Sequence, residues 1–301
     1  MPFRMVEISH PAEVHVKQGQ LVIEQEAGTA SIPLDDLELV VADGPGIRLS
    51  TMAQTMLAQR NIMVVLMGRN HLPAALTIPM VANARLARVS ANQVALTDGQ
   101  RDRLWQAIVR RKIENQARVL AKLGREGAED VLSYSESLLP GDPDCCEGQA
   151  AREYFDYLQP GLNRRKPSPL NSALNYGYAI VRSMVARSLV TTGFIPALGI
   201  HHRSQLNAFN LADDVIEPFR PCVDLVAIEL APATEALDSR QRKILRQVLE
   251  NAVLVNTQEM QVQTAIDVCA DSLKRAIAED DCRKVALPIV MPIKHLPSIR
   301  S

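Results

Sequence analysis

The chain has 301 residues, of which 47% are hydrophobic and 22% are charged, and its formal net charge is −1. This length suits two domains of ordinary size, and the composition is that of a globular protein, which excludes disordered, collagen-like and low-complexity chains. No apolar run approaches the ~18 residues of a membrane-spanning helix, and the first ten residues contain no apolar signal segment. We therefore expect a cytoplasmic protein with no membrane partner.

The cysteines favour reduced thiols over a disulfide framework, because their number is odd and two of them are adjacent. None has the C-x-x-C spacing of a structural zinc site. They are Cys145, Cys146, Cys222, Cys269 and Cys282. The small net charge hides a segregation, since residues 1–80 contain 5 Lys or Arg and 8 Asp or Glu, whereas residues 101–125 contain 8 and 2. We therefore expect any nucleic-acid surface in the later part of the chain.

Residues 1–80 are predicted to form a small β-rich domain, because short alternating or β-branched runs recur between turn signals. Gln18-Gly19 is a predicted hairpin turn, since glycine accepts a positive φ. Thr51 and Gln54 have capping-box spacing before one short helix. Residues 81–97 are predicted to link this domain to the next. The predicted strands lie at 13–17, 20–24, 37–41 and 62–67.

From Thr97 onward the apolar period becomes helical, so residues 98–301 are predicted to form a larger all-α domain. One helix over 98–124 has an apolar stripe and basic remaining faces, after a capping box of Thr97 and Gln100. Another helix begins near Asp144, and a third runs from Pro169 to about Thr192. Residues 239–280 are predicted to be further amphipathic helix, and the proline-spaced tail to be extended. The predicted fold class is therefore α+β.

Glu147 stands at an unusual place for a surface acid, because helical spacing puts it on the same face as Ala150, Tyr154 and Leu158, which should be buried. A carboxylate that turns inward needs a partner. The alternative is an acid in the first helical turn that complements the positive end of the helix dipole.

The segment 194–224 is the densest polar cluster in otherwise apolar surroundings. Asp214 and Glu217 are three residues apart, so on a helix their like charges would repel unless a cation neutralised them. Carboxylates with one imidazole and no thiolate favour Mg²⁺ or Mn²⁺ over Zn²⁺. The alternative is an interior network in which Asp214 pairs with Arg203 or Arg220, and spacing alone leaves both open.

Several sequence blocks occur in an order and at spacings that are typical of one protein family. They are Glu147-Gly148, Leu174-Asn175-Tyr176-Gly177-Tyr178, Leu198-Gly199-Ile200-His201-His202, Leu211-Ala212-Asp213-Asp214 and Glu217-Pro218-Phe219-Arg220-Pro221. This set resembles the CRISPR-associated adaptation integrase, CRISPR-associated protein one, in the form that accompanies type II systems. The resemblance extends more weakly over the whole chain.

The resemblance implies a metal-dependent DNA endonuclease and integrase that joins the 3′-OH ends of short foreign DNA to a CRISPR repeat. It places the catalytic cation, Mg²⁺ or Mn²⁺, on Glu147, His202 and Glu217, with Asp214 as a further acid in or beside the ligand set. His202 is preferred to His201 because it lies fifteen residues before Glu217, as in the type II pattern. Candidate DNA contacts are Arg164, Arg165, Lys166, Asn175, Tyr176, His201, Arg203 and Arg220, together with the basic faces of the 98–124 helix (Arg103, Arg110, Arg111 and Lys112).

The implied partners are double-stranded DNA, both spacer precursor and repeat, and a second copy of the chain joined through the β domain. A small adaptation partner, CRISPR-associated protein two, would complete a heterohexamer in a prokaryotic cytoplasm. The type II effector nuclease and a DNA-end-binding ring protein are further expected partners. Two rival functions stay open: a stand-alone branched-DNA endonuclease using the same site, and a non-catalytic DNA-end-binding scaffold whose acids only form salt bridges.

Overall fold

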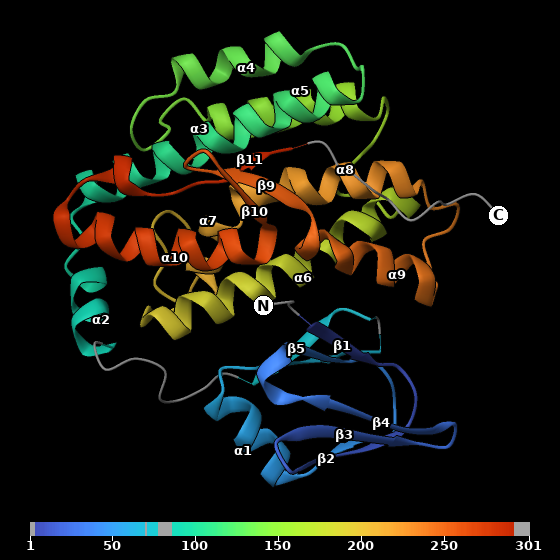
Figure 1. The fold of residues 1–301 in the computed structure, drawn as a ribbon. Helices are drawn as coiled ribbons and strands as arrows, with labels where there is room; N and C mark the ends of the chain where they lie inside the picture. Colours follow the sequence, from blue (N-terminus) through green and yellow to red (C-terminus); the bar gives the residue numbers. More distant parts are fainter. Residues whose placement is uncertain (1–3, 70, 78–85, 292–301) are drawn as a thin grey trace. The chain divides into compact units, whose positions relative to one another are not determined.

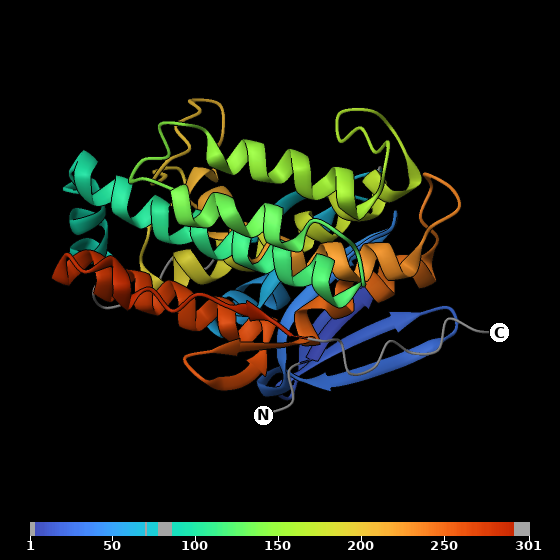
Figure 2. The same ribbon diagram turned by 90° about the horizontal axis from the view of Figure 1, so that it is seen from above.

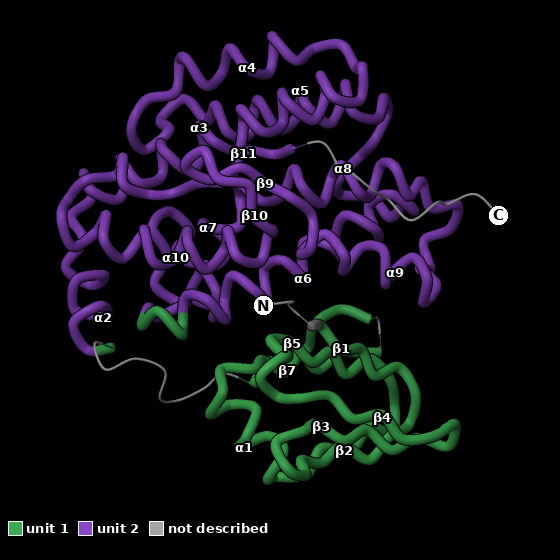
Figure 3. The backbone as a smooth tube through the Cα atoms, viewed as in Figure 1, with its two compact units in different colours: residues 1–86, 190–193 green, residues 87–189, 194–301 purple. Residues whose placement is uncertain are grey.

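A computed structural model describes residues 4–69, 71–77 and 86–291. The chain divides into two compact units, residues 1–86 with 190–193, and residues 87–189 with 194–301 (Figure 3). The first is mainly β and the second mainly helical, which confirms the predicted α+β class. Within the described residues, no helix is both long and apolar enough to cross a membrane.

Among its described residues, the first unit contains two four-stranded sheets, one α-helix and a 3₁₀ turn at Leu34–Asp36 (Figure 1). The sheet orders are β1-β5-β7-β8 and β4-β3-β2-β6. Its core includes Val14, Leu21, Leu57 and Val64, all with at most 1% of their surface exposed. The elements are β1 Arg4–Ile8, β2 Ala12–Lys17, β3 Gln20–Gln25, β4 Gly28–Pro33, β5 Leu37–Ala42, β6 Ile47–Leu49, α1 Thr51–Gln59, β7 Met63–Met67 and β8 Pro73–Thr77.

The four strands predicted in this unit are confirmed as β2, β3, β5 and β7. Gln18 and Gly19, both with positive φ, make the β2–β3 turn. Strand β4 escaped prediction because its side chains are almost all exposed, so its sequence has no apolar alternation. The predicted cap at Thr51 is wrong by one residue: the Ser50 hydroxyl accepts a hydrogen bond from the Ala53 amide.

The second unit is built mainly from helices and adds one small sheet, ordered β10-β9-β11. Helix α2 occupies residues 86–94 of the predicted 81–97 linker, which leaves the short connection 95–97 before α3, while residues 81–85 lie outside the described ranges. The elements are α2 Leu86–Val94, α3 Asp98–Lys122, α4 Ala128–Ser137, α5 Cys146–Leu158, α6 Pro169–Thr192, α7 Asn210–Val215, α8 Arg220–Leu230, α9 Ser239–Arg246, β9 Ala252–Val255, β10 Gln258–Gln261, α10 Val262–Glu279 and β11 Ile289–Val290, with short 3₁₀ turns at Glu217–Phe219, Gln247–Glu250 and Cys282–Lys284.

Helix α3 is the central support of the second unit. The predicted capping box of Thr97 and Gln100 starts it, with each side chain bonding the other residue's backbone amide. Its buried stripe includes Trp105, Ile113 and Leu120. It packs against α4, α5 and α8, and Figures 1 and 2 show α3, α4 and α5 lying side by side. Any residue on the inner faces of α3 and α5 is therefore held on rigid elements.

The prediction of continuous helix over 239–280 is wrong in its middle. The β9–β10 hairpin separates α9 from α10 and turns at Asn256 and Thr257, both with positive φ. Strand β11 pairs with β9, so the expected extended tail begins as a strand. This second pairing partner of β9 lies more than thirty residues further along the chain, which a local pattern cannot reveal.

Gly177 lets α6 and α8 approach closely. A Cβ atom at this position would lie 2.4 Å from Cγ1 of Val223, which is fully buried. A contact that short forces neighbouring atoms to move, so the glycine is required by packing rather than by backbone conformation.

We predict that Gly177→Ala lowers the free energy of unfolding by ~1–3 kcal/mol, although alanine favours helix, because overpacking outweighs the ~1 kcal/mol of helix propensity. Urea unfolding followed by the fluorescence of Trp105, the one tryptophan, measures this. Gly177→Ala with Val223→Ala should recover stability relative to Val223→Ala alone. A double variant that shows no such recovery would mean that this contact is not the cause.

Candidate metal and DNA-processing site

Glu147 lies in the first turn of α5 and faces inward. Asp142 fixes that turn, because its carboxylate accepts hydrogen bonds from the amides of Cys146 (2.7 Å) and Glu147 (3.0 Å). Ala150, Tyr154 and Leu158 follow on the buried side. Glu147 therefore faces inward, as predicted, and its side chain is 31% exposed. It also lies in the first helical turn, as the alternative interpretation required.

Lys112 is the partner that Glu147 requires. Its ammonium forms ion pairs with Oε1 of Glu147 and with Oε2 of Glu217, so one cation joins α3, α5 and the turn before α8. The Lys112 side chain is 8% exposed and that of Glu217 is 7% exposed. The other oxygen of Glu217 accepts from Nε of Arg220 at 2.8 Å. The prediction of Lys112 on a DNA-facing surface of its helix is wrong, because the side chain turns inward to these two acids.

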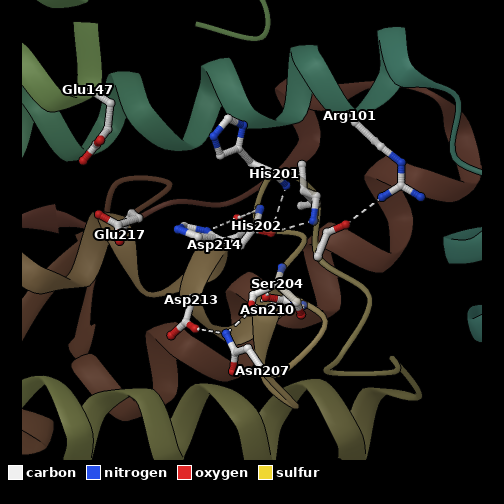
Figure 4. Close-up of polar contacts among 12 residues, drawn as sticks. Arg101, Glu147, His201, His202, Ser204, Asn207, Asn210, Asp213, Asp214 and Glu217 are labelled. Carbon is white, nitrogen blue, oxygen red and sulfur yellow. Dashed lines mark hydrogen bonds and ion pairs between the residues drawn. The ribbon is translucent and has the colours of Figure 1, made fainter. Parts of the chain in front are cut away.

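Asp214 shapes the loop that carries the two histidines. One of its oxygens accepts from the amides of Ile200 and His201, and the other accepts from the amide of His202 at 3.1 Å. The second oxygen also lies 2.7 Å from Nδ1 of the His202 ring (Figure 4). Because a carboxylate can only accept, the neutral ring carries its proton on Nδ1, which leaves the Nε2 lone pair available.

The contact between Asp214 and His202 decides which partner Asp214 has, a question that the sequence spacing left open. Asp214 is fully buried and pairs with His202, not with Arg203 or Arg220. Asp214 and Glu217 also serve different partners, since α7 ends at Val215 and Glu217 begins a 3₁₀ turn. Their expected repulsion depended on one continuous helix, and the 3₁₀ turn that begins at Glu217 interrupts that helix.

Gln93 and Arg101, which were not among the predicted site residues, hold the loop before the histidines in place. The Gln93 side chain donates to the carbonyls of Ile195 and Leu198 and accepts from the amide of Ile195. Arg101 donates to the carbonyl of Gly199 at 2.6 Å. A Cβ on Gly199 would lie 2.2 Å from the carbonyl oxygen of His202, so only glycine fits. The signal available in the sequence was the polar Gln93 on the apolar face of α2.

His201 lies on the other side of this loop. Its ring stacks on Trp105 with centroids 4.2 Å apart and planes 5° from parallel, and its outer face is exposed. A cavity of about 480 Å³ adjoins His202 and is lined by polar and basic groups that include Arg101, Arg203 and Asn210. The site therefore combines buried acids with an open polar cavity next to an aromatic surface.

The electrostatics follow from these contacts. The hydrogen bond to Asp214 raises the pKa of His202 against the opposing effect of burial, and the charge of Glu217 adds to the rise. Burial works to raise the pKa of Glu217, but Lys112 and Arg220 outweigh it and hold that pKa at about 2. Burial lowers the pKa of Lys112, and the two carboxylates more than offset this, so its pKa is raised. Lys112 and Glu217 therefore both carry their charges at neutral pH.

The predicted ligands Glu147, His202 and Glu217 are brought to one region, but they do not converge on one point. Within residues 4–69, 71–77 and 86–291, no group of three or more His, Cys, Asp or Glu side chains is close enough to hold a metal ion. The two glutamates converge on the Lys112 ammonium, and the His202 ring points toward the side where Glu217 lies (Figure 4). The donor set fits a divalent cation in its chemistry, since hard oxygen ligands and a neutral imidazole are present.

A second buried network supports Glu217 from behind. Arg220 lies over the ring of Tyr178, whose hydroxyl donates to Asp224, and Tyr154 donates to the same carboxylate at 3.0 Å. Burial raises the pKa of Asp224 to about 6. Arg220, expected to contact DNA, is thus committed to orienting Glu217.

The other predicted DNA contacts divide into exposed and internal groups. Arg165, Lys166 and Asn175 are exposed, as is Arg203, which pairs with Asp98 at 3.3 Å. Arg164 is half-buried and engaged by the protein itself, since it donates to Asn171 and Asn175 and lies over the Phe155 ring.

Tyr176 is 2% exposed, and its hydroxyl accepts from the buried Arg246. Its prediction as a DNA contact is wrong, because the ring packs inside the helical unit. On the basic faces of α3, Arg103 pairs with Asp280 and Arg111 with Glu114, whereas Arg110 is exposed.

The cysteines take no part in this site. Cys146 is buried, and burial raises the pKa of its thiol, which disfavours the reactive thiolate. All five cysteines are free thiols, as the sequence predicted.

Comparison with known proteins supports a common origin for this arrangement. Residues 6–261 match the family described as "CRISPR associated protein Cas1". The chain is 30% identical over 300 residues to a CRISPR-associated endonuclease Cas1 of Neisseria meningitidis serogroup C (strain 8013), with 98% of this chain and 99% of the relative covered.

Two solved structures share the fold. A casposase bound to an integration product superposes with a TM-score of 0.77 at 18% identity, covering 100% of this chain and 96% of that one. The Cas6-RT-Cas1–Cas2 complex superposes with a TM-score of 0.72 at 17% identity, covering 96% of this chain and 36% of that one.

We predict that Asp214→Asn lowers the pKa of His202 from its raised value, because the hydrogen bond and the charge of the Asp214 carboxylate no longer oppose the effect of burial. A raised pKa in the folded state contributes stability that is present below the unfolded pKa and is lost as the pH rises through the folded pKa. The variant should lose this acid-side contribution. NMR titration of the His202 ring measures the shift, and an unchanged pKa would show that Asp214 does not control the ring.

Proposed function

Because the chain belongs to the CRISPR associated protein Cas1 family, we propose that it is a metal-dependent DNA endonuclease and integrase of CRISPR adaptation, in its type II form. It would join the 3′-OH ends of short foreign DNA to the CRISPR repeat. The observation that carries this proposal is the convergence of Glu147 and Glu217 on one buried cationic position, beside a histidine oriented by Asp214.

Glu147, Glu217 and Nε2 of His202 are the groups that would hold Mg²⁺ or Mn²⁺. When bound, such a cation neutralises charge on the nonbridging oxygens of a phosphodiester during its transfer between alcohols. Asp214 keeps the His202 proton on Nδ1, and Arg220 fixes the carboxylate plane of Glu217. Burial of Lys112 and Glu217 limits water around the Glu217 carboxylate and strengthens the charge interactions that it makes.

The DNA backbone would pass the open side of this site. The cavity beside His202 offers Arg101 and Arg203, and the exposed face of His201 offers a stacking surface. Arg165, Lys166 and Asn175 are exposed in the loop before α6 and in its first turns, where they would contact phosphates and sugars.

The same reading gives the partners. The first unit would join two copies in a homodimer, and the small partner, CRISPR-associated protein two, would complete a heterohexamer. A fold neighbour is named as a complex that contains Cas1 and Cas2, which supports this choice of partner. The effector nuclease and the DNA-end-binding ring protein of type II systems are further proposed partners.

A scaffold without catalysis is the second candidate, because Glu147 and Glu217 do form ion pairs with Lys112. Integration into a supercoiled repeat plasmid, with and without CRISPR-associated protein two, separates the candidates. Transfer that requires Mg²⁺ or Mn²⁺ and the partner supports the integrase. Cleavage of branched DNA without the partner supports a stand-alone nuclease, and no metal-dependent product at all supports the scaffold.

We predict that Glu147→Gln and Glu217→Gln each nearly eliminate strand transfer, whereas Asp214→Asn costs about 10–100-fold, because Asp214 acts through the histidine. Higher Mn²⁺ should partly rescue Asp214→Asn, since its defect lies in metal occupancy. Metal titrations of strand transfer for the three variants measure this. Full activity of either glutamine variant would remove that residue from the site.

We predict that Arg165→Ala with Lys166→Ala weakens DNA binding across all sequences and reduces the log–log salt slope by up to about 0.9 for each lost phosphate contact. Arg164→Ala is the matched comparison, because Arg164 is engaged internally and its loss should reduce stability instead. Fluorescence anisotropy over a salt series measures the slope. If the double variant kept the wild-type slope, these two residues would not contact phosphates.

A further inference from the structure

The two carboxylate oxygens of Glu217 are both engaged. Nε of Arg220 donates to Oε1 at 2.8 Å, and the Lys112 ammonium pairs with Oε2. The side chain is 7% exposed, so water does not easily replace either partner. Any metal ion that binds Glu217 from the side of Glu147 must therefore meet the ammonium.

The same ammonium also pairs with Oε1 of Glu147. The Lys112 ammonium is thus the shared partner of a carboxylate from α5 and a carboxylate from the turn before α8. Two carboxylates this close would repel without a cation between them, and the buried setting makes that repulsion strong. Lys112 removes the repulsion in the protein without metal.

We propose that Lys112 occupies the metal position in the metal-free protein and exchanges with the divalent cation when it binds. An ammonium and a divalent cation cannot share the same two oxygens without strong mutual repulsion. The lysine stem is flexible, so its head can move away while α3 stays in place. This inference rests on the proposed function, because it concerns the same acids.

Exchange has a consequence for binding and stability. The metal must displace a bound cation, so the wild-type site binds metal more weakly than its acids alone would. In return, the folded protein stays stable without metal, because the acids always have a counter-charge. Lys112 is therefore a positioning residue whose removal strengthens metal binding while destabilising the metal-free protein.

The test is a titration of the metal-free full-length protein with Mn²⁺, in which electron paramagnetic resonance measures the free Mn²⁺. Lys112→Met should bind Mn²⁺ about tenfold more tightly than wild type, since the ammonium that competes with Mn²⁺ for the two glutamates is removed. Arg111→Met is the matched control. It removes one positive charge from the neighbouring residue, which pairs with Glu114 and not with the site. It should change the affinity by less than about twofold.

Thermal melting gives an independent readout. Metal-free Lys112→Met should melt well below wild type, and saturating Mn²⁺ should bring the two melting temperatures together. If the methionine variant does not fold without metal, Lys112→Gln should show the same pattern with a smaller loss.

Affinity that is unchanged or weaker in both Lys112 variants would overturn the exchange. The proposed function fails in a different way: wild type would show no Mn²⁺ binding that Glu147→Gln abolishes. The two failures are therefore distinguishable in one set of titrations.

Discussion

The ion pairs of Lys112 with Glu147 and Glu217 are the interaction on which the helical unit's site depends. A buried ammonium is costly to desolvate, and only close carboxylates compensate for that cost. Because Glu147 and Glu217 both pair with the Lys112 ammonium, α5 and the turn before α8 are held against α3 at this position. The site is thus organised by a charge requirement, and the apolar stripe of α3 supplies the rigid frame in which that requirement is met.

A second constraint acts on the loop that carries His201 and His202: its backbone amides need hydrogen-bond acceptors. Asp214 accepts from three consecutive amides and also sets the proton position on His202. Gly199 and Gln93 allow and fix the path of the loop. One carboxylate therefore connects the fold of the loop to the chemistry of its histidine, so a change at Asp214 affects both.

The exposed and internal arginines have separate roles that their sequence positions do not distinguish. Arg164 and Arg220 both lie over the Tyr178 ring and support the site from inside. Arg165, one residue from Arg164, is exposed. The direction of each side chain is set by which neighbour needs an ion pair or a ring contact, and neighbouring residues in a turn can point in opposite directions.

The sequence by itself determined the α+β class, the strands at 13–17 and 20–24, the capped α3 helix, the inward face of Glu147 and the family, because each rests on a local period or a motif. Only the tertiary structure decided that Lys112 is a buried partner, that Asp214 serves His202, that Tyr176 is internal and that β9 pairs with β11. These facts depend on contacts between segments far apart in the chain. A local pattern shows that a side chain turns inward, but the three-dimensional packing determines which charge it meets there.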